Sequence, residues 1–136
     1  MWFYVQFCSL PFFRWKQNLA NIRALFQAQK FLVPQIQEKI RQIASPMDAA
    51  LEGRNRQNPL RPDWEEVKDE VMLQALRMKF SQNPEIAKGL VATGDAILIE
   101  HTRNDDYWAD GGDGSGKNKL GLLLMQVREE LKNSNL

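Results

Sequence analysis

The apolar and polar positions of this chain predict a run of helices and one short strand. The run Ala96–Ile99 is short, partly β-branched and closed by Glu100, which favours a buried strand. A polar, glycine-rich loop follows, and apolar spacing resumes over Leu120–Val127, which predicts a helix. The central feature is therefore a loop held between a strand and a helix, and binding residues concentrate on such loops.

Helix signals divide the first half of the chain. Residues 18–32 predict a helix, and Pro34 ends it, because the residue before a proline is pushed out of helical geometry. Isoleucines at helical spacing then predict a second helix: Ile36, Ile40 and Ile43. Ser45 followed by Pro46 combines a capping side chain with a proline in the first turn, and this third helix ends near Gly53.

The longest predicted helix follows a basic, proline-containing loop, Arg54–Pro62. Asp63 and Glu66 form a pair resembling a capping box at its start. Its apolar residues point one way: Trp64, Val67, Val71, Ala75 and Leu76, with Phe80 near the end. Asn83 and Pro84 begin another short helix that finishes at Gly94. The pattern contains no repeat and no second domain.

Composition narrows the function classes. A chain of 136 residues suits one domain with a modest core. Its 18 basic and 17 acidic residues nearly cancel, so it lacks the charge expected of a non-specific nucleic-acid binder. The single cysteine, Cys8, excludes an internal disulfide, and one histidine cannot complete a Cys/His zinc set. Without an apolar run of membrane-spanning length, we expect a cytoplasmic protein that does not engage a membrane.

Two familiar motifs nearly fit the glycine-rich loop, and the sequence argues against both. Gly111–Lys117 satisfies G-x-x-x-x-G-K, but Asn118 replaces the Ser or Thr that holds magnesium in a nucleotide-binding loop. Four aspartates suggest calcium: Asp105, Asp106, Asp110 and Asp113. Their spacing is not that of an EF-hand, and no glutamate closes the loop. We therefore predict no metal site, and the residues alone favour a surface turn.

A set of short phrases in fixed order carries more information. They are Gln27-Ala28-Gln29-Lys30-Phe31, Gly53-Arg54, Lys79-Phe80, Thr93-Gly94-Asp95-Ala96, Asp105-x-x-Trp108, Gly116-Lys117-Asn118-x-Leu120-Gly121 and Leu124-Met125-x-x-Arg128. Together they resemble the NADAR (YbiA-like) family from Phe26 to about Leu131. The resemblance implies a compact, predominantly helical α+β single domain that hydrolyses N-glycosidic bonds.

The resemblance also implies two catalytic residues. Cleavage of an N-glycosidic bond passes through an oxocarbenium-like state and needs a carboxylate and a donor for the departing base. Asp105, at the family's D-x-x-W position, would be the carboxylate, whereas the bare residues favour a turn-capping aspartate. Lys30 would donate a hydrogen bond, bind phosphate or form a Schiff base with an opened sugar, and its alternative is a surface lysine.

Four more side chains are implied in substrate binding: Gln27, Arg54, Trp108 and Asn118. Trp108 would stack on a base or else anchor the core, and Arg54 would take a phosphate or stay solvated. Gln27 would read a base edge or cap a neighbouring group, and Asn118 would bond the ligand or the loop. Glu100 is a reserve carboxylate, and His101 is expected on the surface.

The segment 1–25 departs from the family. The family has a segment resembling W-x-T-x-E-H-Y-F before Q-A-Q-K-F, but here Arg23 occupies its Glu position and Ala24 its His position. Codons compatible with Trp2–Phe26 exist whose neighbouring reading frame spells G-F-M-S-N-F-A-P-Y-P-F-F-D-G-N-K-T-W-P-T-S-E-H-Y-F. We hypothesise that residues up to about Leu25 are an out-of-frame translation, with the NADAR-like domain over 26–136.

The resemblance to the NADAR family implies an N-glycosidase, and nothing in the sequence calls for a cofactor. Its partner would be a small molecule, a phosphoribosylamino-pyrimidine intermediate of riboflavin biosynthesis, with release of ribose 5-phosphate. One alternative is a glycohydrolase for ADP-ribosylated guanine. Others are an inactive ligand-binding relic that lacks the Glu-His pair and a helical interaction module.

Overall fold

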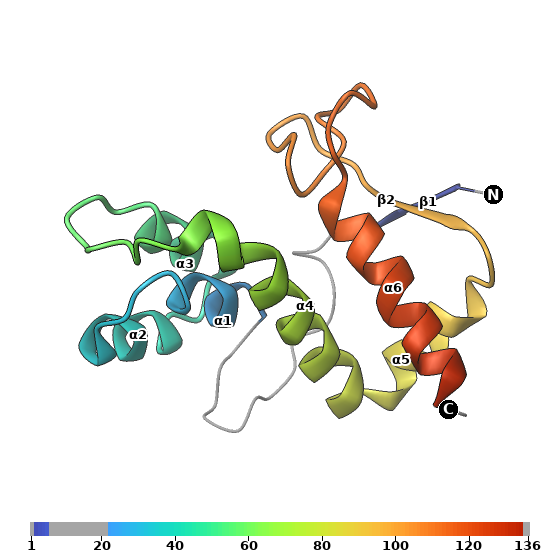
Figure 1. Ribbon diagram of the computed structural model, residues 1–136, viewed down its shortest axis with the longest axis horizontal. Helices are drawn as coiled ribbons and strands as arrows, with labels where there is room; N and C mark the ends of the chain where they lie inside the picture. The colour runs from blue at the N-terminus through green and yellow to red at the C-terminus, as the bar shows by residue number, and fades with distance from the viewer. Residues whose placement is uncertain (1, 6–21, 135–136) are drawn as a thin grey trace. The chain divides into compact units, whose positions relative to one another are not determined.

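The computed structural model describes residues 2–5 and 22–134, which form two compact units. One unit contains residues 22–82 and the other contains 2–5 and 83–134. The described elements, labelled in Figure 1, are β1 (Trp2–Val5), α1 (Ile22–Ala28), α2 (Pro34–Arg41), α3 (Pro46–Gly53), α4 (Trp64–Gln82), α5 (Pro84–Ala92), β2 (Ile97–Glu100) and α6 (Lys119–Asn133). The predicted α+β class, mainly helical with a small strand component, is confirmed.

The 22–82 unit is helical, with α1 packed against α2, α3 and α4. Figure 1 shows α1 among these helices. Phe26 of α1 meets Trp64 of α4 with ring centroids 5.1 Å apart, and Phe31, Ile40 and Leu76 are fully buried. Such aromatic and aliphatic burial is the main favourable term that holds a unit of this size together.

The helix starts in this unit follow the sequence signals. Pro34 is the first residue of α2, with Val33 extended before it. Ser45 precedes Pro46 at the start of α3, and its Oγ accepts a hydrogen bond from the Asp48 N–H at 3.3 Å. The cap and the proline therefore begin α3 as predicted.

The end of α1 corrects the predicted helix over 18–32. The helix stops at Ala28, and Phe31 forms an antiparallel bridge with Leu60. Phe31 is 1% exposed, so leaving the helix places its ring in the core. Residues 18–21 of the predicted helix lie outside the described residues.

The buried face of α4 also differs from the prediction. Val67 and Val71 are only partly buried, whereas Met72, Leu73 and Lys79 are buried. The inward face contains two lysines, since the Lys68 side chain is 18% exposed and Lys79 is 1% exposed. Trp64, Ala75, Leu76 and Phe80 are buried as predicted. Lysine stems also bury readily along apolar surface, so counting apolar residues alone left Lys79 out of this face.

In the other unit, β1 and β2 form a two-stranded parallel sheet, with Trp2 opposite Ile97 and Val5 opposite Glu100. The strand predicted at Ala96–Ile99 is confirmed as β2, although it begins at Ile97 and includes Glu100. Its burial alternates, with Leu98 at 1% and Ile97 at 40% exposure. The β1 strand was not predicted, and residues 6–21 of the segment 1–25 lie outside the described residues.

Helix α6, which the apolar spacing over Leu120–Val127 predicted, packs against β2 and α5. The buried Arg128 of α6 donates to Thr93 Oγ1 at 2.9 Å and to the Ala96 carbonyl at 2.8 Å. It therefore joins α6 to the turn that leads into β2, so its role in this structure is to hold these two elements together.

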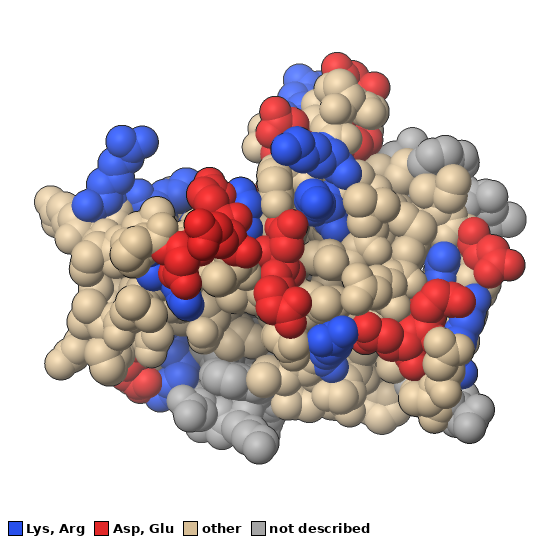
Figure 2. All heavy atoms as spheres, in the orientation of Figure 1, with Lys and Arg blue, Asp and Glu red and all other residues tan. Residues whose placement is uncertain are grey.

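Charge is spread rather than gathered on the face shown in Figure 2, where blue and red side chains are interspersed. Among the described residues, no helix combines the length and apolarity that crossing a bilayer requires.

Candidate functional site

Three of the implied site residues converge within the 22–82 unit. Lys30, in the turn after α1, points its Nζ toward the end of α3 and donates to the Gly53 carbonyl at 3.4 Å. The same Nζ lies 5.9 Å from the centroid of the Trp64 ring. Arg54 directly follows Gly53, and Gln27 precedes Lys30 by three residues. A helix-terminal carbonyl and an aromatic face both favour a cationic amine.

The surroundings of Lys30 act on its protonation. Partial burial lowers the pKa of its ammonium, and the positive charge of Arg54 lowers it further. Glu65 opposes this, and Lys68 adds to it. The balance lowers the pKa from its ordinary value, which raises the share of neutral amine near neutral pH. Neutral lysine is the nucleophilic form, so this environment suits a Schiff-base lysine.

Gln27 lies against the Gly53 backbone. It is 7% exposed, and its Oε1 has no hydrogen-bond partner among the described residues. A Cβ atom on Gly53 would stand 1.9 Å from Oε1 and 2.7 Å from Cδ of Gln27. The amide of Gln27 and the amine of Lys30 therefore meet the same short piece of backbone, which only glycine leaves open.

Asp105 and Trp108 lie together in the loop of the other unit. Asp105 Oδ1 accepts hydrogen bonds from the backbone N–H of Tyr107 at 2.9 Å and of Trp108 at 2.8 Å. Trp108 is partly buried and packs edge-to-face on Tyr107, with centroids 4.8 Å apart. Asp105 thus holds the turn that presents Trp108, and its catalytic role stays a prediction.

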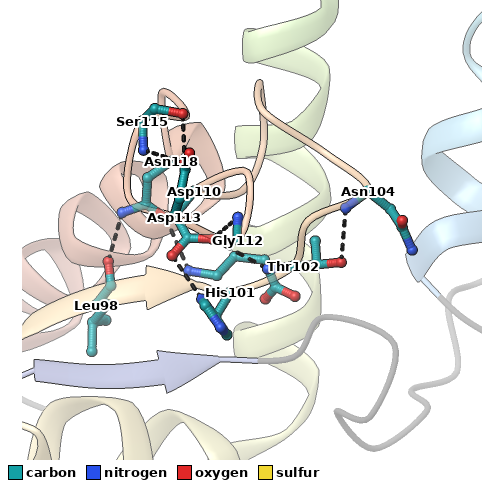
Figure 3. Close-up of polar contacts among 10 residues, drawn as sticks. Leu98, His101, Thr102, Asn104, Asp110, Gly112, Asp113, Ser115 and Asn118 are labelled. Atoms are coloured by element: carbon teal, nitrogen blue, oxygen red, sulfur yellow. Dashed lines mark hydrogen bonds and ion pairs between the residues drawn. The ribbon is translucent and has the colours of Figure 1, made fainter.

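Asn118 joins the loop to the strand (Figure 3). Its Nδ2 donates to the Leu98 carbonyl at 2.9 Å, and its Oδ1 accepts from the Glu100 N–H at 2.9 Å. Both polar atoms of the Asn118 amide therefore form hydrogen bonds with the backbone of β2. Asn118 was expected to bond either the ligand or the protein, and the structure shows bonds within the protein. Gly121 allows this approach, since a Cβ there would stand 2.2 Å from the Leu98 carbonyl.

The glycine-rich loop does not offer its amides to a phosphate. Backbone N–H groups donate to carbonyls of the preceding segment, in the pairs Gly116 to Asp110, Lys117 to Asp106, Asn118 to Ala109, Lys119 to Tyr107 and Leu120 to Trp108, at 2.7 to 3.0 Å. A phosphate-binding loop needs such groups free to face the anion. This loop is instead closed on itself, in agreement with the rejection of the nucleotide-hydrolase motif.

A histidine and an aspartate organise the start of the loop. His101 Nδ1 lies 2.7 Å from Asp110 Oδ2, while Asp110 Oδ1 accepts from the N–H groups of Thr102 and Gly112 (Figure 3). The bond to His101, followed by these backbone bonds, lowers the pKa of the Asp110 carboxyl. The His101 side chain is about half exposed, as expected. Glu100, the reserve carboxylate, is buried.

Two residues beside Lys30 escaped the sequence reading. Trp64 was assigned to the core stripe of α4, and Gly53 was noted only as the end of a helix and as part of a family phrase. No spacing rule marks either one, because their importance comes from the approach of α1 to α3 and α4. The one local signal for Trp64 was an aromatic residue placed just after the arginine-containing loop Arg54–Pro62.

Comparison with known proteins identifies the chain's relatives. A family model described as the NADAR domain matches residues 9–132. The N-glycosidase YbiA of Escherichia coli (strain K12) is 58% identical over 106 residues, which cover 78% of this chain and 66% of that protein. A riboflavin biosynthesis protein of Vibrio vulnificus (strain YJ016) is 46% identical over 107 residues, covering 79% of this chain and 29% of its own length.

The fold has a solved counterpart. The NMR structure of the E. coli protein YbiA is similar with a TM-score of 0.87 and 45% sequence identity, over 99% of this chain and 86% of that one. In sequence, the matched part of the chain spans slightly less than two thirds of the YbiA relatives.

Proposed function

The chain belongs to the NADAR family, and from that premise we propose that it is an N-glycosidase that hydrolyses phosphoribosylamino-pyrimidine intermediates of riboflavin biosynthesis. Support comes from relatives named N-glycosidase YbiA and from others named as riboflavin biosynthesis proteins, one of them from Arabidopsis thaliana at 48% identity. These names favour a phosphoribosylated pyrimidine over ADP-ribosylated guanine as the substrate.

The environment of Lys30 is the observation that carries the proposal. Its amine is partly buried, directed by the Gly53 carbonyl and close to the Trp64 ring, and its pKa is lowered by burial and then by Arg54. A neutral amine in such a place attacks a sugar carbon far better than a solvated ammonium does. A fully solvated surface lysine would keep its ordinary pKa.

The reaction that we assign to Lys30 balances in three steps. The neutral Nζ attacks the anomeric carbon, the carbon–nitrogen bond to the base breaks, and the departing amine takes the proton that Nζ releases. The bond between the anomeric carbon and the ring oxygen then breaks as Nζ forms the C=N bond, and the ring oxygen takes the second Nζ proton, which leaves the opened sugar joined to Lys30 as a Schiff base. Water adds to this imine and releases ribose 5-phosphate, which restores the free lysine.

Further roles follow the family positions residue by residue. Asp105 would stabilise developing positive charge or direct water, Arg54 would bind the phosphate, Gln27 would read the base edge and Trp108 would stack on the ring. Asn118 would act indirectly, by holding the loop that carries Asp105 and Trp108.

The test is borohydride trapping. We expect reduction during turnover of the phosphoribosylamino-pyrimidine to leave a phosphopentityl group on Lys30, located by peptide mass spectrometry. Lys30→Arg keeps the charge but cannot form the imine, so it should give neither adduct nor ribose 5-phosphate. Release of ribose 5-phosphate without any adduct would contradict the Schiff-base mechanism. Activity only on ADP-ribosylated guanine, with release of ADP-ribose, would show that the proposed substrate is wrong.

One observation favours the inactive relic as a second candidate. Ala24 stands at the family's His position and is completely buried in α1, one turn before Gln27. Its methyl group supplies no acid, base or hydrogen bond. A protein that binds ribose 5-phosphate but turns over no glycoside would fit this candidate.

A further inference from the structure

Gly53 is the meeting point of two side chains to which we assign chemistry in the proposed function. It is the last residue of α3 and is buried. Its carbonyl accepts from Lys30 Nζ at 3.4 Å, and its bare Cα faces the amide of Gln27. Neither Lys30 nor Gln27 belongs to α3, so the contact depends on how closely α1 approaches the end of that helix.

The end of α3 explains why a lysine comes here. The last carbonyls of a helix have no partner within the helix, and a positive group near them is favourable. The Ala50 and Leu51 carbonyls accept from the Arg54 N–H, and the Glu52 carbonyl accepts from the Asn55 N–H. The last turn of α3 contains no basic residue of its own, so Lys30 supplies the positive charge at the Gly53 carbonyl.

The absence of a side chain at position 53 is what permits this approach. A Cβ atom would stand 1.9 Å from Gln27 Oε1, 2.7 Å from its Cδ and 3.2 Å from its Cβ. Rotation of the amide would relieve only the first two contacts, and Gln27 is 7% exposed, with little room to swing. An added methyl would therefore force α1 and α3 apart and lengthen a contact that is already 3.4 Å.

We propose that Gly53 is a positioning residue that fixes the amine of Lys30 through its carbonyl and the amide of Gln27 through its bare Cα. The idea deepens the proposed function, since it says what sets the direction of the lysine. It also accounts for the buried Oε1 of Gln27, which gains close packing on Gly53 in place of a hydrogen bond within the described residues.

The experiment combines Gly53→Ala, Gln27→Ala and the double variant, with Gly89→Ala as matched control. Gly89 is also helical, and a Cβ there would meet nothing within 4 Å. The first readout needs no substrate: the pH midpoint of Lys30 acylation by acetic anhydride, followed by mass spectrometry. Arg54, Glu65 and Lys68, whose charges act on Lys30, are the same in all variants.

We expect Gly53→Ala to move that midpoint up toward the ordinary lysine value, and Gly89→Ala to leave it in place. Turnover by Gly53→Ala should fall about 10²-fold, as displacements near 1 Å can cause. In the double variant, the contacts with Oε1 and Cδ are gone and only the 3.2 Å contact with the Cβ of residue 27 remains, so both readouts should return most of the way to those of Gln27→Ala alone. Unchanged acylation in Gly53→Ala, or purely additive losses in the double variant, would overturn the inference.

The two readouts separate this inference from the proposed function. If no glycoside is hydrolysed by any variant but the acylation midpoint responds as expected, the positioning role stands and the enzymatic proposal fails. If turnover is high and the midpoint is the same in Gly53→Ala and the unmodified protein, the enzyme stands and the positioning role fails.

Discussion

Asp105 has a structural role in its turn and a proposed catalytic role, and one substitution can separate the two. Its Oδ1 closes the turn by accepting from the Tyr107 and Trp108 N–H groups, whereas the proposed catalysis uses its negative charge. Asparagine keeps an oxygen at Oδ1 but removes the charge. We expect Asp105→Asn to keep the thermal midpoint of the protein while its turnover falls about 10²- to 10⁴-fold, the usual worth of a catalytic carboxylate.

Asp105→Ala is the comparison for this test. It removes the turn as well, so we expect a further loss of about 1 kcal/mol of stability for each hydrogen bond that disappears. The measurements are thermal unfolding and steady-state turnover of both variants. If Asp105→Asn turns over as fast as the unmodified protein, the charge of Asp105 is not needed for catalysis and its role is to hold the turn.

At the same scale, the sequence led to residue identities but not to their partners. Lys30 and Gln27 were found because a family phrase contains them, and their spacing places them near one end of α1. Gly53 and Trp64 gain their meaning only when α1 meets α3 and α4. Close approaches between segments more than twenty residues apart leave no local signal, so no reading of one stretch could predict them.

Among the elements, the signals at helix starts were reliable and those for faces and ends were not. Pro46 and Pro84 each stand in the first turn of a helix, as predicted, and Pro34, which was predicted to end the preceding helix, is the first residue of α2. These signals depend on the backbone geometry of one or two residues and therefore depend little on how the rest of the chain packs. The end of α1 and the face of α4 depend instead on what the rest of the unit covers.

The start of α4 is an exception among the helix starts. Asp63 was predicted to form a capping box with Glu66, but its two carboxylate oxygens accept from Arg61 at 2.6 and 3.0 Å. The Glu66 N–H bonds the main-chain oxygen of Asp63 instead. A neighbouring guanidinium offers a charged, two-pronged partner and competes successfully with a neutral backbone amide.

The buried Lys79 of α4 makes stability depend on pH. Burial lowers the pKa of its ammonium to about 8, against 10.5 in the unfolded chain. Between these values, the unfolded chain holds a proton that the folded chain has released, so the free energy of unfolding rises with pH across this window. Below pH 8, where both states are protonated, the cost of burying the charge is fully present.

We therefore expect Lys79→Met to change the pH profile of stability. Relative to this variant, the unmodified protein should gain roughly 2 to 3 kcal/mol between pH 7 and pH 10, from the difference between the two pKa values. Urea unfolding at both pH values measures the gain. Lys88→Met, which changes an exposed lysine of α5, is the control and should show no such difference. A gap that stays constant with pH would contradict the expected titration.

For the whole molecule, the near balance of charge points to a small ligand. A net charge of +1 and interspersed signs on the face in Figure 2 give little attraction to a long polyanion. One phosphate needs only a local cation, and Arg54, exposed beside the Lys30 amine, supplies one. The expected salt dependence of turnover is correspondingly shallow.

We expect the segment before Gln27 to determine how much of the proposed activity this chain has. Arg23 and Ala24 replace the family's Glu and His, and the buried methyl of Ala24 has no acid–base chemistry. We expect the chain as given to turn over slowly. A protein whose residues 2–26 are replaced by the segment of the neighbouring frame should turn over about 10²- to 10⁴-fold faster, which is the range for one general acid or base.

The control is the replaced protein with glutamine and alanine in place of its Glu-His pair. Equal turnover by all three proteins would show that the pair is dispensable and would leave Lys30 and Asp105 to account for catalysis, whereas a fast replaced protein with a slow control would assign the missing acid–base step to that pair.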